Sequence, residues 1–211
     1  MKKLKFVTMA CCVAAMGLTS CLNDSDDTRS EMSKEELAYC LNKVKGTYDG
    51  NLIYVAKNVK DVNDNTDTLK ISWNIANDST MTIKNFPTRL LTDNISDEKL
   101  KTALAEAPNQ DIECRIGFIN SSPVQYLINP KAPSYNINHD GADHKIQVAF
   151  YANSTNSFGS LNQTKKVLYM QIVEGAIYMD GKQTAYLTAD TPFAFEAKKN
   201  NYLRTITLPL A

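Results

Sequence analysis

The sequence predicts a mainly β protein: a single antiparallel β-barrel or sandwich of about eight or nine strands with two short peripheral helices. Apolar and polar residues alternate along most segments after residue 46, as in strands that bury one face. Only two segments have helical spacing, and strands do not alternate with helices, which excludes a doubly wound parallel sheet. The chain has 211 residues, the size of one domain, and its 43% hydrophobic and 22% charged residues are typical of a folded soluble protein.

Residues 1–20 have the pattern of an export signal. Three lysines among the first five residues precede an almost wholly apolar run over residues 6–18, which is too short to remain as a membrane-spanning helix. The run ends in Leu-Thr-Ser-Cys at residues 18–21, which resembles the bacterial lipobox. This resemblance implies that the chain is cut before Cys21, that the Cys21 sulfur is lipidated and that its new amine is acylated. The alternative is an ordinary secretory signal with an incidental cysteine.

An acidic tether is predicted over residues 21–31. Its segment Leu-Asn-Asp-Ser-Asp-Asp, at residues 22–27, is similar to the export signal of surface lipoproteins of the Bacteroidetes. The resemblance implies an outer membrane lipoprotein on the cell surface. A plain solvated spacer, with the domain on the periplasmic face, is the alternative. Each buried methylene contributes about 0.8 kcal/mol, so several acyl chains on one cysteine make the attachment effectively permanent.

The charge of the chain excludes nucleic acid as a partner. The whole sequence has 23 basic and 23 acidic residues. Removal of the signal takes away Lys2, Lys3 and Lys5, which leaves 20 basic residues and a net charge of −3. Because no basic field remains, we expect contact with the membrane through the lipid anchor alone.

Residues 32–211 are predicted to form one β-rich domain that opens with a helix. Ser33 and Glu36 have the spacing of a capping box, and Gly46 is a natural stop. A second helix is predicted from an N-cap at Ser96 to the region before Pro108. The apolar stripes of the two helices are Leu37, Cys40, Leu41 and Val44, and Leu100, Ala103, Leu104 and Ala107.

The predicted strands follow the period-two pattern or are short apolar runs. Asp180-Gly181 is a tight hairpin signal between the two strands that flank it. The strands are expected over residues 48–56, 68–75, 81–83, 112–118, 145–150, 167–173, 177–179, 185–187 and 202–208.

Two segments contain candidate metal ligands. The first has oxygen-bearing side chains at alternate positions, which resembles the start of a calcium loop, but glycine and the bidentate glutamate are missing at their places, so a solvated hairpin loop is favoured. The second contains both histidines of the chain, which with Asp140 or Asp143 could ligate a transition metal, although an exposed turn is favoured. No cofactor is expected. The candidate ligands are Asp61, Asn63, Asn65 and Asp67, and His139 and His144.

Two further residue pairs are candidates for modification. Cys40 and Cys114 lie on apolar stripes and could form a disulfide in an oxidising envelope, or remain as buried free thiols. Thr68 and Ser79 lie in Asp-Thr-Leu and Asp-Ser-Thr, which resemble the short O-glycosylation motif of Bacteroidetes envelope proteins.

The sequence contains no motif of an enzyme. It has no G-x-S-x-G elbow, Walker loop, H-E-x-x-H or C-x-x-C. Glu113 and Glu174 are expected on polar faces or strand ends, which disfavours a pair of catalytic carboxylates. The chain is therefore expected not to be an enzyme.

The whole chain resembles a Bacteroides lipoprotein family of roughly 200 residues, a domain of unknown function. The resemblance rests on the signal, the tether, Lys-Gly-Thr-Tyr-Asp-Gly at residues 45–50 and Phe86-Pro87. Gly46-Thr47-Tyr48 is also similar to the lipocalin G-x-W start, with tyrosine for tryptophan. We expect a non-catalytic binding or accessory module for a small apolar or glycan ligand or a partner protein. The alternatives are a structural envelope component with a filled core and a carboxylate-dependent hydrolase.

Overall fold

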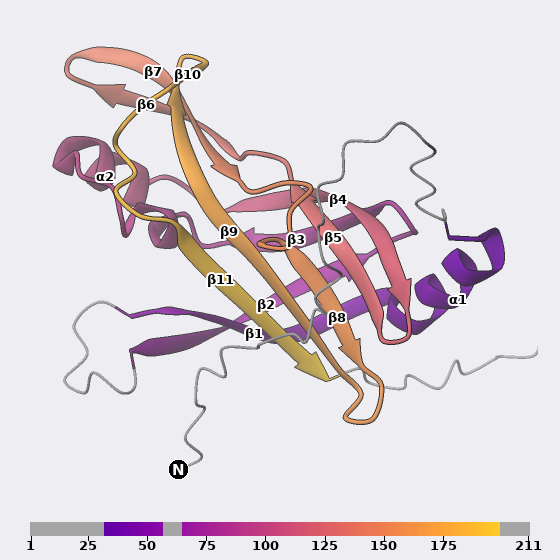
Figure 1. The fold of residues 1–211 in the computed structure, drawn as a ribbon. Coiled ribbons are helices and arrows are strands. Elements are labelled where there is room, and N and C mark those ends of the chain that lie inside the picture. Colours follow the sequence, from indigo (N-terminus) through magenta and orange to yellow (C-terminus); the bar gives the residue numbers. More distant parts are fainter. Residues whose placement is uncertain (1–31, 57–64, 199–211) are drawn as a thin grey trace, which may run out of the picture.

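The computed structural model describes residues 32–56 and 65–198, which form two α-helices, one 3-10 helix and eleven strands (Figure 1). In chain order these are α1 (Lys34–Val44), β1 (Gly46–Val55), β2 (Thr66–Ile75), β3 (Thr80–Phe86), η1 (Thr88–Thr92), α2 (Glu98–Ala105), β4 (Gln110–Ser121), β5 (Val124–Pro130), β6 (Ser134–His139), β7 (Ala142–Phe150), β8 (Phe158–Asn162), β9 (Val167–Met179), β10 (Lys182–Gln183) and β11 (Thr191–Lys198).

Eight of the strands form a closed antiparallel barrel, as the mainly β prediction allowed. The barrel order is β1, β2, β3, β4, β5, β8, β9 and β11, and β11 pairs with both β9 and β1, which closes the ring. Consecutive barrel strands are neighbours, the up-and-down order that lipocalins also use. The β6–β7 hairpin and β10 lie outside this ring and pair onto β9.

The strand β9 is long enough to join the barrel to the outer hairpin. Its first part, from Val167 to Gln171, pairs with β8, and its later part, from Glu174 to Met179, pairs with β7. A β-bulge lies where β7 begins to leave, since Ala149 pairs with Ala176 and Phe150 pairs with Glu174. The extra residue of the bulge is Gly175, against which the Tyr151 ring packs so closely that a Cβ there would lie 2.7 Å from it.

The two ends of the barrel are closed by different elements, and we name them by their helices. At the α1 end, short connections over residues 76–79, 122–123 and 163–166 join neighbouring strands, and α1 leads into β1. At the α2 end the connections are longer: η1 and α2 lie between β3 and β4, the β6–β7 hairpin lies between β5 and β8, and β10 lies between β9 and β11. Figure 1 shows α1 and α2 at opposite sides of the molecule.

The first helix forms as predicted, and the second begins one residue later than predicted. Ser33 and Glu36 make both bonds of the capping box, Ser33 N to Glu36 Oε2 at 2.9 Å and Glu36 N to Ser33 Oγ at 3.2 Å. In α2 the N-cap is Asp97, whose carboxylate accepts from the Leu100 amide at 2.8 Å. The prediction of Ser96 was wrong because its hydroxyl instead donates to the Tyr186 carbonyl at 3.1 Å.

Several strand predictions need correction. Residues 167–179 form one strand, and beyond the Asp180-Gly181 turn only β10 pairs back. Residues 185–187 leave the sheet, and Leu187 instead forms an isolated bridge with Ile95, which lies between η1 and α2. Five strands were not predicted, namely β5, β6, β8, β10 and β11. The predicted strand over 202–208 lies outside the described residues.

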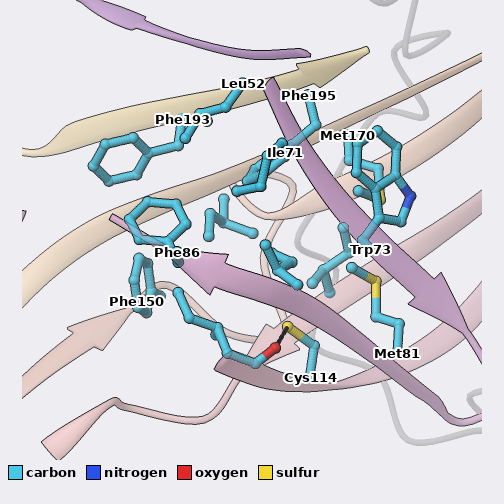
Figure 2. Close-up of a cluster of buried hydrophobic side chains, with 14 of the residues drawn as sticks. Leu52, Ile71, Trp73, Met81, Phe86, Cys114, Phe150, Met170, Phe193 and Phe195 are labelled. Atoms are coloured by element: carbon cyan, nitrogen blue, oxygen red, sulfur yellow. Dashed lines mark hydrogen bonds between the residues drawn. The ribbon is translucent and has the colours of Figure 1, made fainter. Parts of the chain in front are cut away.

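The bore of the barrel is filled by side chains (Figure 2). Trp73 is 0% exposed, stacks on Tyr48 with ring centroids 5.5 Å apart, and meets Phe195 edge-on at 5.9 Å. Gly159 leaves room for the Tyr126 ring, which occupies the place a Cβ would take. The largest fully buried side chains are Trp73, Tyr126, Phe86, Phe193, Phe195, Leu52, Ile75, Met81, Ile83, Leu90, Leu91 and Leu100. Within the described ranges, neither helix is long and apolar enough to cross a bilayer.

Candidate binding site

The candidate calcium ligands, for which a solvated hairpin loop was the favoured interpretation, are only partly described. Asp61 and Asn63 lie outside the described residues, as does the lipidation candidate Cys21. Asn65 is exposed at the start of the returning strand. Asp67 has a structural role, because its carboxylate accepts from the Tyr54 hydroxyl at 3.0 Å and from the Thr68 amide at 2.7 Å.

The two histidines lie close together but do not form a metal centre. The turn between them is the two residues Asp140-Gly141, and the His139 and His144 rings are 6.2 Å apart between centroids. His139 is only 6% exposed, so the expectation of an exposed turn was wrong for this residue. Among the described residues, no three His, Cys, Asp or Glu side chains form a group that could hold a metal ion.

Each histidine instead joins two elements at the α2 end. His139 Nε2 lies 3.2 Å from Asp97 Oδ1, so the residue that caps α2 also holds the end of β6. His144 Nδ1 lies 2.7 Å from Asp180 Oδ2, which fastens β7 to the turn after β9. This pairing contributes to a lowered pKa of Asp180. The two pairs explain why both histidines are structural.

Cys40 and Cys114 are both free and buried, so the disulfide alternative is not formed. The Cys40 thiol donates to the Asn120 carbonyl at 3.7 Å and the Cys114 thiol to the Ile112 carbonyl at 3.6 Å. Burial raises the pKa of Cys114 to about 12, which leaves its thiol protonated and a poor nucleophile. The glycosylation candidates Thr68 and Ser79 are exposed.

Three buried side chains have polar atoms without a hydrogen-bond partner among the described residues. They are Trp73, through Nε1, Tyr126, through its hydroxyl, and Glu174, through both carboxyl oxygens. Leaving a neutral donor unpaired costs about 1–3 kcal/mol, and more for a charged group. Native proteins have few such groups, and each calls for a physical explanation.

Glu174 is the residue that sequence reasoning placed wrongly. It was expected on a polar face or a strand end, but it is 0% exposed and lies within β9. The cause was the predicted break after residue 173. Because β9 runs on to Met179, Glu174 stays on the face of Met170 and Ile172, which points into the barrel. The sequence did contain a signal for this position, namely an acidic residue next to a glycine within an apolar run, Glu174-Gly175.

The surroundings of Glu174 come from four elements of the α2 end. Across the sheet it pairs with Thr191 of β11 on one side and Phe150 of β7 on the other. Asp93, directly after η1, and Tyr135 of β6 lie near enough to interact with its charge. The carboxyl is therefore enclosed by barrel wall, outer hairpin and the η1 segment together.

Burial governs the ionisation of this carboxyl. The pKa of Glu174 is raised from 4.5 to about 8, mainly by burial and in smaller part by the negative charge of Asp93, while the Thr191 hydroxyl opposes the rise. The Glu174 charge in turn helps burial to raise the pKa of Tyr135, whose hydroxyl bonds Thr88 at 3.2 Å. At neutral pH the carboxyl is therefore mostly protonated, because burial disfavours its charged form.

Four hydrogen bonds hold the segment beside Glu174 in place. The Asn94 side-chain amide donates to the Thr191 hydroxyl at 3.0 Å and to the Ala189 carbonyl at 3.2 Å. The Thr188 amide and hydroxyl both donate to the Asn94 carbonyl at 2.9 Å. Asn94 thus ties the chain after η1 to the chain before β11.

Comparison with known proteins gives a family and no further relative. The model of the family described as Domain of unknown function (DUF4840) matches residues 43–179, more than half of the chain. This span begins near the end of α1 and ends with β9, so it includes Glu174. No curated protein and no solved structure gives a match.

Proposed function

The chain belongs to the DUF4840 family, and we propose that it is a non-catalytic binding module, anchored by lipid at Cys21 to the outer membrane, whose binding surface is the α2 end. The anchored domain lies at the cell surface, on the outer face of the outer membrane. The alternative is the periplasmic face. The barrel is the scaffold that carries this end. A partner or ligand would therefore bind at the α2 end of the barrel and not inside its bore.

The observation that carries this proposal is the filled bore. An eight-stranded barrel is just wide enough either to be filled by its own side chains or to hold one small ligand. Here the interior contains Trp73, Tyr126 and Phe195, each at most 1% exposed. The filling favours a scaffold over a carrier of an elongated apolar ligand.

The position of α1 indicates on which side of the barrel the lipid anchor would be attached. Met32, the first described residue, immediately precedes α1. Ten residues lie between Cys21 and Met32, so the eleven steps from one to the other limit their distance to about 40 Å at full extension. A lipid on Cys21 would attach the chain on the side of α1, which leaves the α2 end available to a partner.

Catalysis by carboxylates is the weaker alternative. Glycoside hydrolysis requires two carboxyl groups on either side of a bound sugar and access for water. Glu174 and Asp93 interact electrostatically, but Glu174 is completely covered. A binding role needs only one partner for this carboxyl and therefore fits the enclosure better.

Fluorescence of the single tryptophan tests the filled bore. Trp73 is the only tryptophan of the chain and lies inside the barrel, so a ligand that enters the bore must approach it. We expect titration with 12-bromododecanoic acid, whose bromine quenches indole on contact, to leave Trp73 emission unchanged. Saturable quenching would show a ligand carrier and would contradict the proposal.

Fractionation of cells tests the anchor. The wild-type chain is expected in the detergent phase after phase separation, and Cys21→Ser in the aqueous phase. Protease added to intact cells then distinguishes the cell surface, where the domain is cleaved, from the periplasmic face, where it is protected. A Cys21→Ser protein that still partitions with membranes would contradict the lipid anchor.

A further inference from the structure

Four ionisable side chains join the start of α2 to the β6–β7 hairpin, which lies beside this helix (Figure 1). The N-cap Asp97 and the helical Lys99 come from α2. The end of β6 contributes His139, and the turn after it contributes Asp140. We call these four residues the His139 cluster. Because two members come from each side, the cluster is a set of contacts that breaks when the helix and the hairpin separate.

His139 lies between the two carboxylates of the cluster. Its Nε2 atom is 3.2 Å from Asp97 Oδ1, and its Nδ1 atom is 3.7 Å from Asp140 Oδ2. The other oxygen of Asp140 forms an ion pair with the Lys99 ammonium. The contacts therefore run from α2 through His139 and Asp140 and return to α2.

The two ring nitrogens of His139 thus both face hydrogen-bond acceptors. A neutral imidazole has one N–H and one lone pair, so it can donate to only one carboxylate and turns the lone pair toward the other. An imidazolium ion has an N–H on each nitrogen and can pair with Asp97 and Asp140 together. The arrangement of the acceptors is therefore satisfied only by the charged ring.

The charge balance of the cluster favours the same form. With a neutral ring, the cluster has two carboxylates and one ammonium group, which leaves one negative charge in excess. A proton on His139 makes the charges alternate in sign and sum to zero. The His139 ring is almost completely buried, so solvent and salt screen its pair with Asp97 less than they screen the exposed pair of Lys99 and Asp140.

The carboxylates of the cluster keep their charge near neutral pH. The pKa of Asp97 is lowered mainly by its hydrogen bond from the Leu100 amide, and that of Asp140 mainly by its hydrogen bond from Lys99. His139 contributes to the lowering of both pKa values. Histidine is the side chain that commonly changes charge between about pH 5 and pH 8. His139 is therefore the member of the cluster that can gain or lose a charge in this range.

Two further rings face His139 from neighbouring elements. The His144 ring, on β7, lies 6.2 Å from the His139 ring between centroids, and its own partner is the Asp180 carboxylate at 2.7 Å. The Tyr186 ring, from the segment before β11, also lies 6.2 Å away. A charge on His144 opposes a charge on His139, but Asp180 is placed to offset it.

We propose that the His139 cluster is a pH-sensitive switch, in which uptake of one proton by His139 fastens α2 to the β6–β7 hairpin and loss of this proton to solvent loosens the contact. When the helix and hairpin separate, His139 loses both carboxylates, so the closed form binds the proton more strongly than the open form. Opening of the α2 end therefore becomes less frequent as pH falls from 8 to 6. The switch does not depend on the proposed binding role of this end.

Hydrogen exchange of the full-length protein at pH 6 and pH 8, corrected for the intrinsic exchange rate of the amides, tests the switch. We expect the α2 amides of the wild type to open at least threefold less often at pH 6 than at pH 8. His139→Gln should lose most of this difference. His144→Gln is the matched control and should keep it, because His144 pairs with Asp180 outside the cluster. Any contribution from Glu174 is common to all three proteins.

Nitrogen NMR of the histidine rings in the unaltered chain gives a second measurement that does not depend on a variant. At pH 6 we expect both ring nitrogens of His139 to show the chemical shifts of an imidazolium ion. A neutral His139 ring at pH 6 would overturn the switch, as would equal pH dependence of opening in the wild type and His139→Gln. Loss of the dependence in His144→Gln would also overturn it. None of these results alters the Trp73 emission or the partition of the Cys21→Ser chain, which test the proposed function separately.

Discussion

The α1 half of the barrel and its α2 end both bury polar atoms without partners, but the consequences differ. In the α1 half these atoms belong to Trp73 and Tyr126, which stay neutral at ordinary pH because burial holds the pKa of Tyr126 well above its usual value. At the α2 end they belong to Glu174, which can gain a charge. The first half is therefore a fixed filling, whereas the second half contains a group that responds to pH.

The connections at the two ends fit this difference. Short turns close the α1 end, and short loops leave little chain that can move. At the α2 end three long connections meet. Side-chain pairs such as Asn94 with Thr191 and His139 with Asp97 hold these connections together. Elements tied by a few hydrogen bonds open at lower free energy than a packed core.

The largest effect is expected in the filled half. Trp73→Ala removes a fully buried indole and its contacts with Tyr48 and Phe195. Loss of a buried large aromatic costs about 3–5 kcal/mol of unfolding free energy. Urea denaturation followed by circular dichroism measures it. A change below about 1 kcal/mol would show that this half is not tightly packed.

The next effect concerns Glu174 and depends on pH. Its folded pKa, about 8, lies above the ordinary value of 4.5, so the folded protein binds the proton more strongly and loses stability as pH rises from about 4.5 to 8. The loss amounts to about 3 kcal/mol by pH 7 and about 5 kcal/mol in total.

Glu174→Gln removes this dependence while keeping the size of the side chain. We expect the unfolding free energy of the variant to stay level between pH 5 and pH 8, where that of the wild type falls. Urea denaturation at pH 5, 7 and 9 measures both slopes. Parallel slopes in the two proteins would mean that Glu174 does not stay buried and protonated.

The smallest effect compares one hydrogen-bonding residue at each end. Asn94→Ala removes two bonds at the α2 end, and Ser33→Ala removes the N-cap bond of α1. Each should cost about 1 kcal/mol. Hydrogen exchange should show faster opening of η1 and β11 only in Asn94→Ala. Equal exchange in both variants would contradict a separately opening α2 end.

Local patterns predicted much of the fold. The alternation in β2 and β4, the capping box of Ser33 and the turn at Asp180-Gly181 were all confirmed, because each depends on neighbours within a few residues. The strands β5 and β8 were missed because their own patterns are short, although each pairs with its neighbour in the chain, β4 and β9 respectively. The candidate site was missed because a single misplaced strand end moved Glu174 to the surface.

By itself the sequence determined the β class, the first helix and its cap, and the expectation of an export signal with Cys21 as the anchor. These follow from short-range periodicity and from the chemistry of adjacent residues. Only the tertiary structure decided that the strands close into a barrel, that Asp97 caps α2 while holding His139, and that Glu174 is enclosed. The closure of the barrel and the enclosure of Glu174 depend on the pairing of β9 with β7 and β11, and that register is set by packing of the whole barrel.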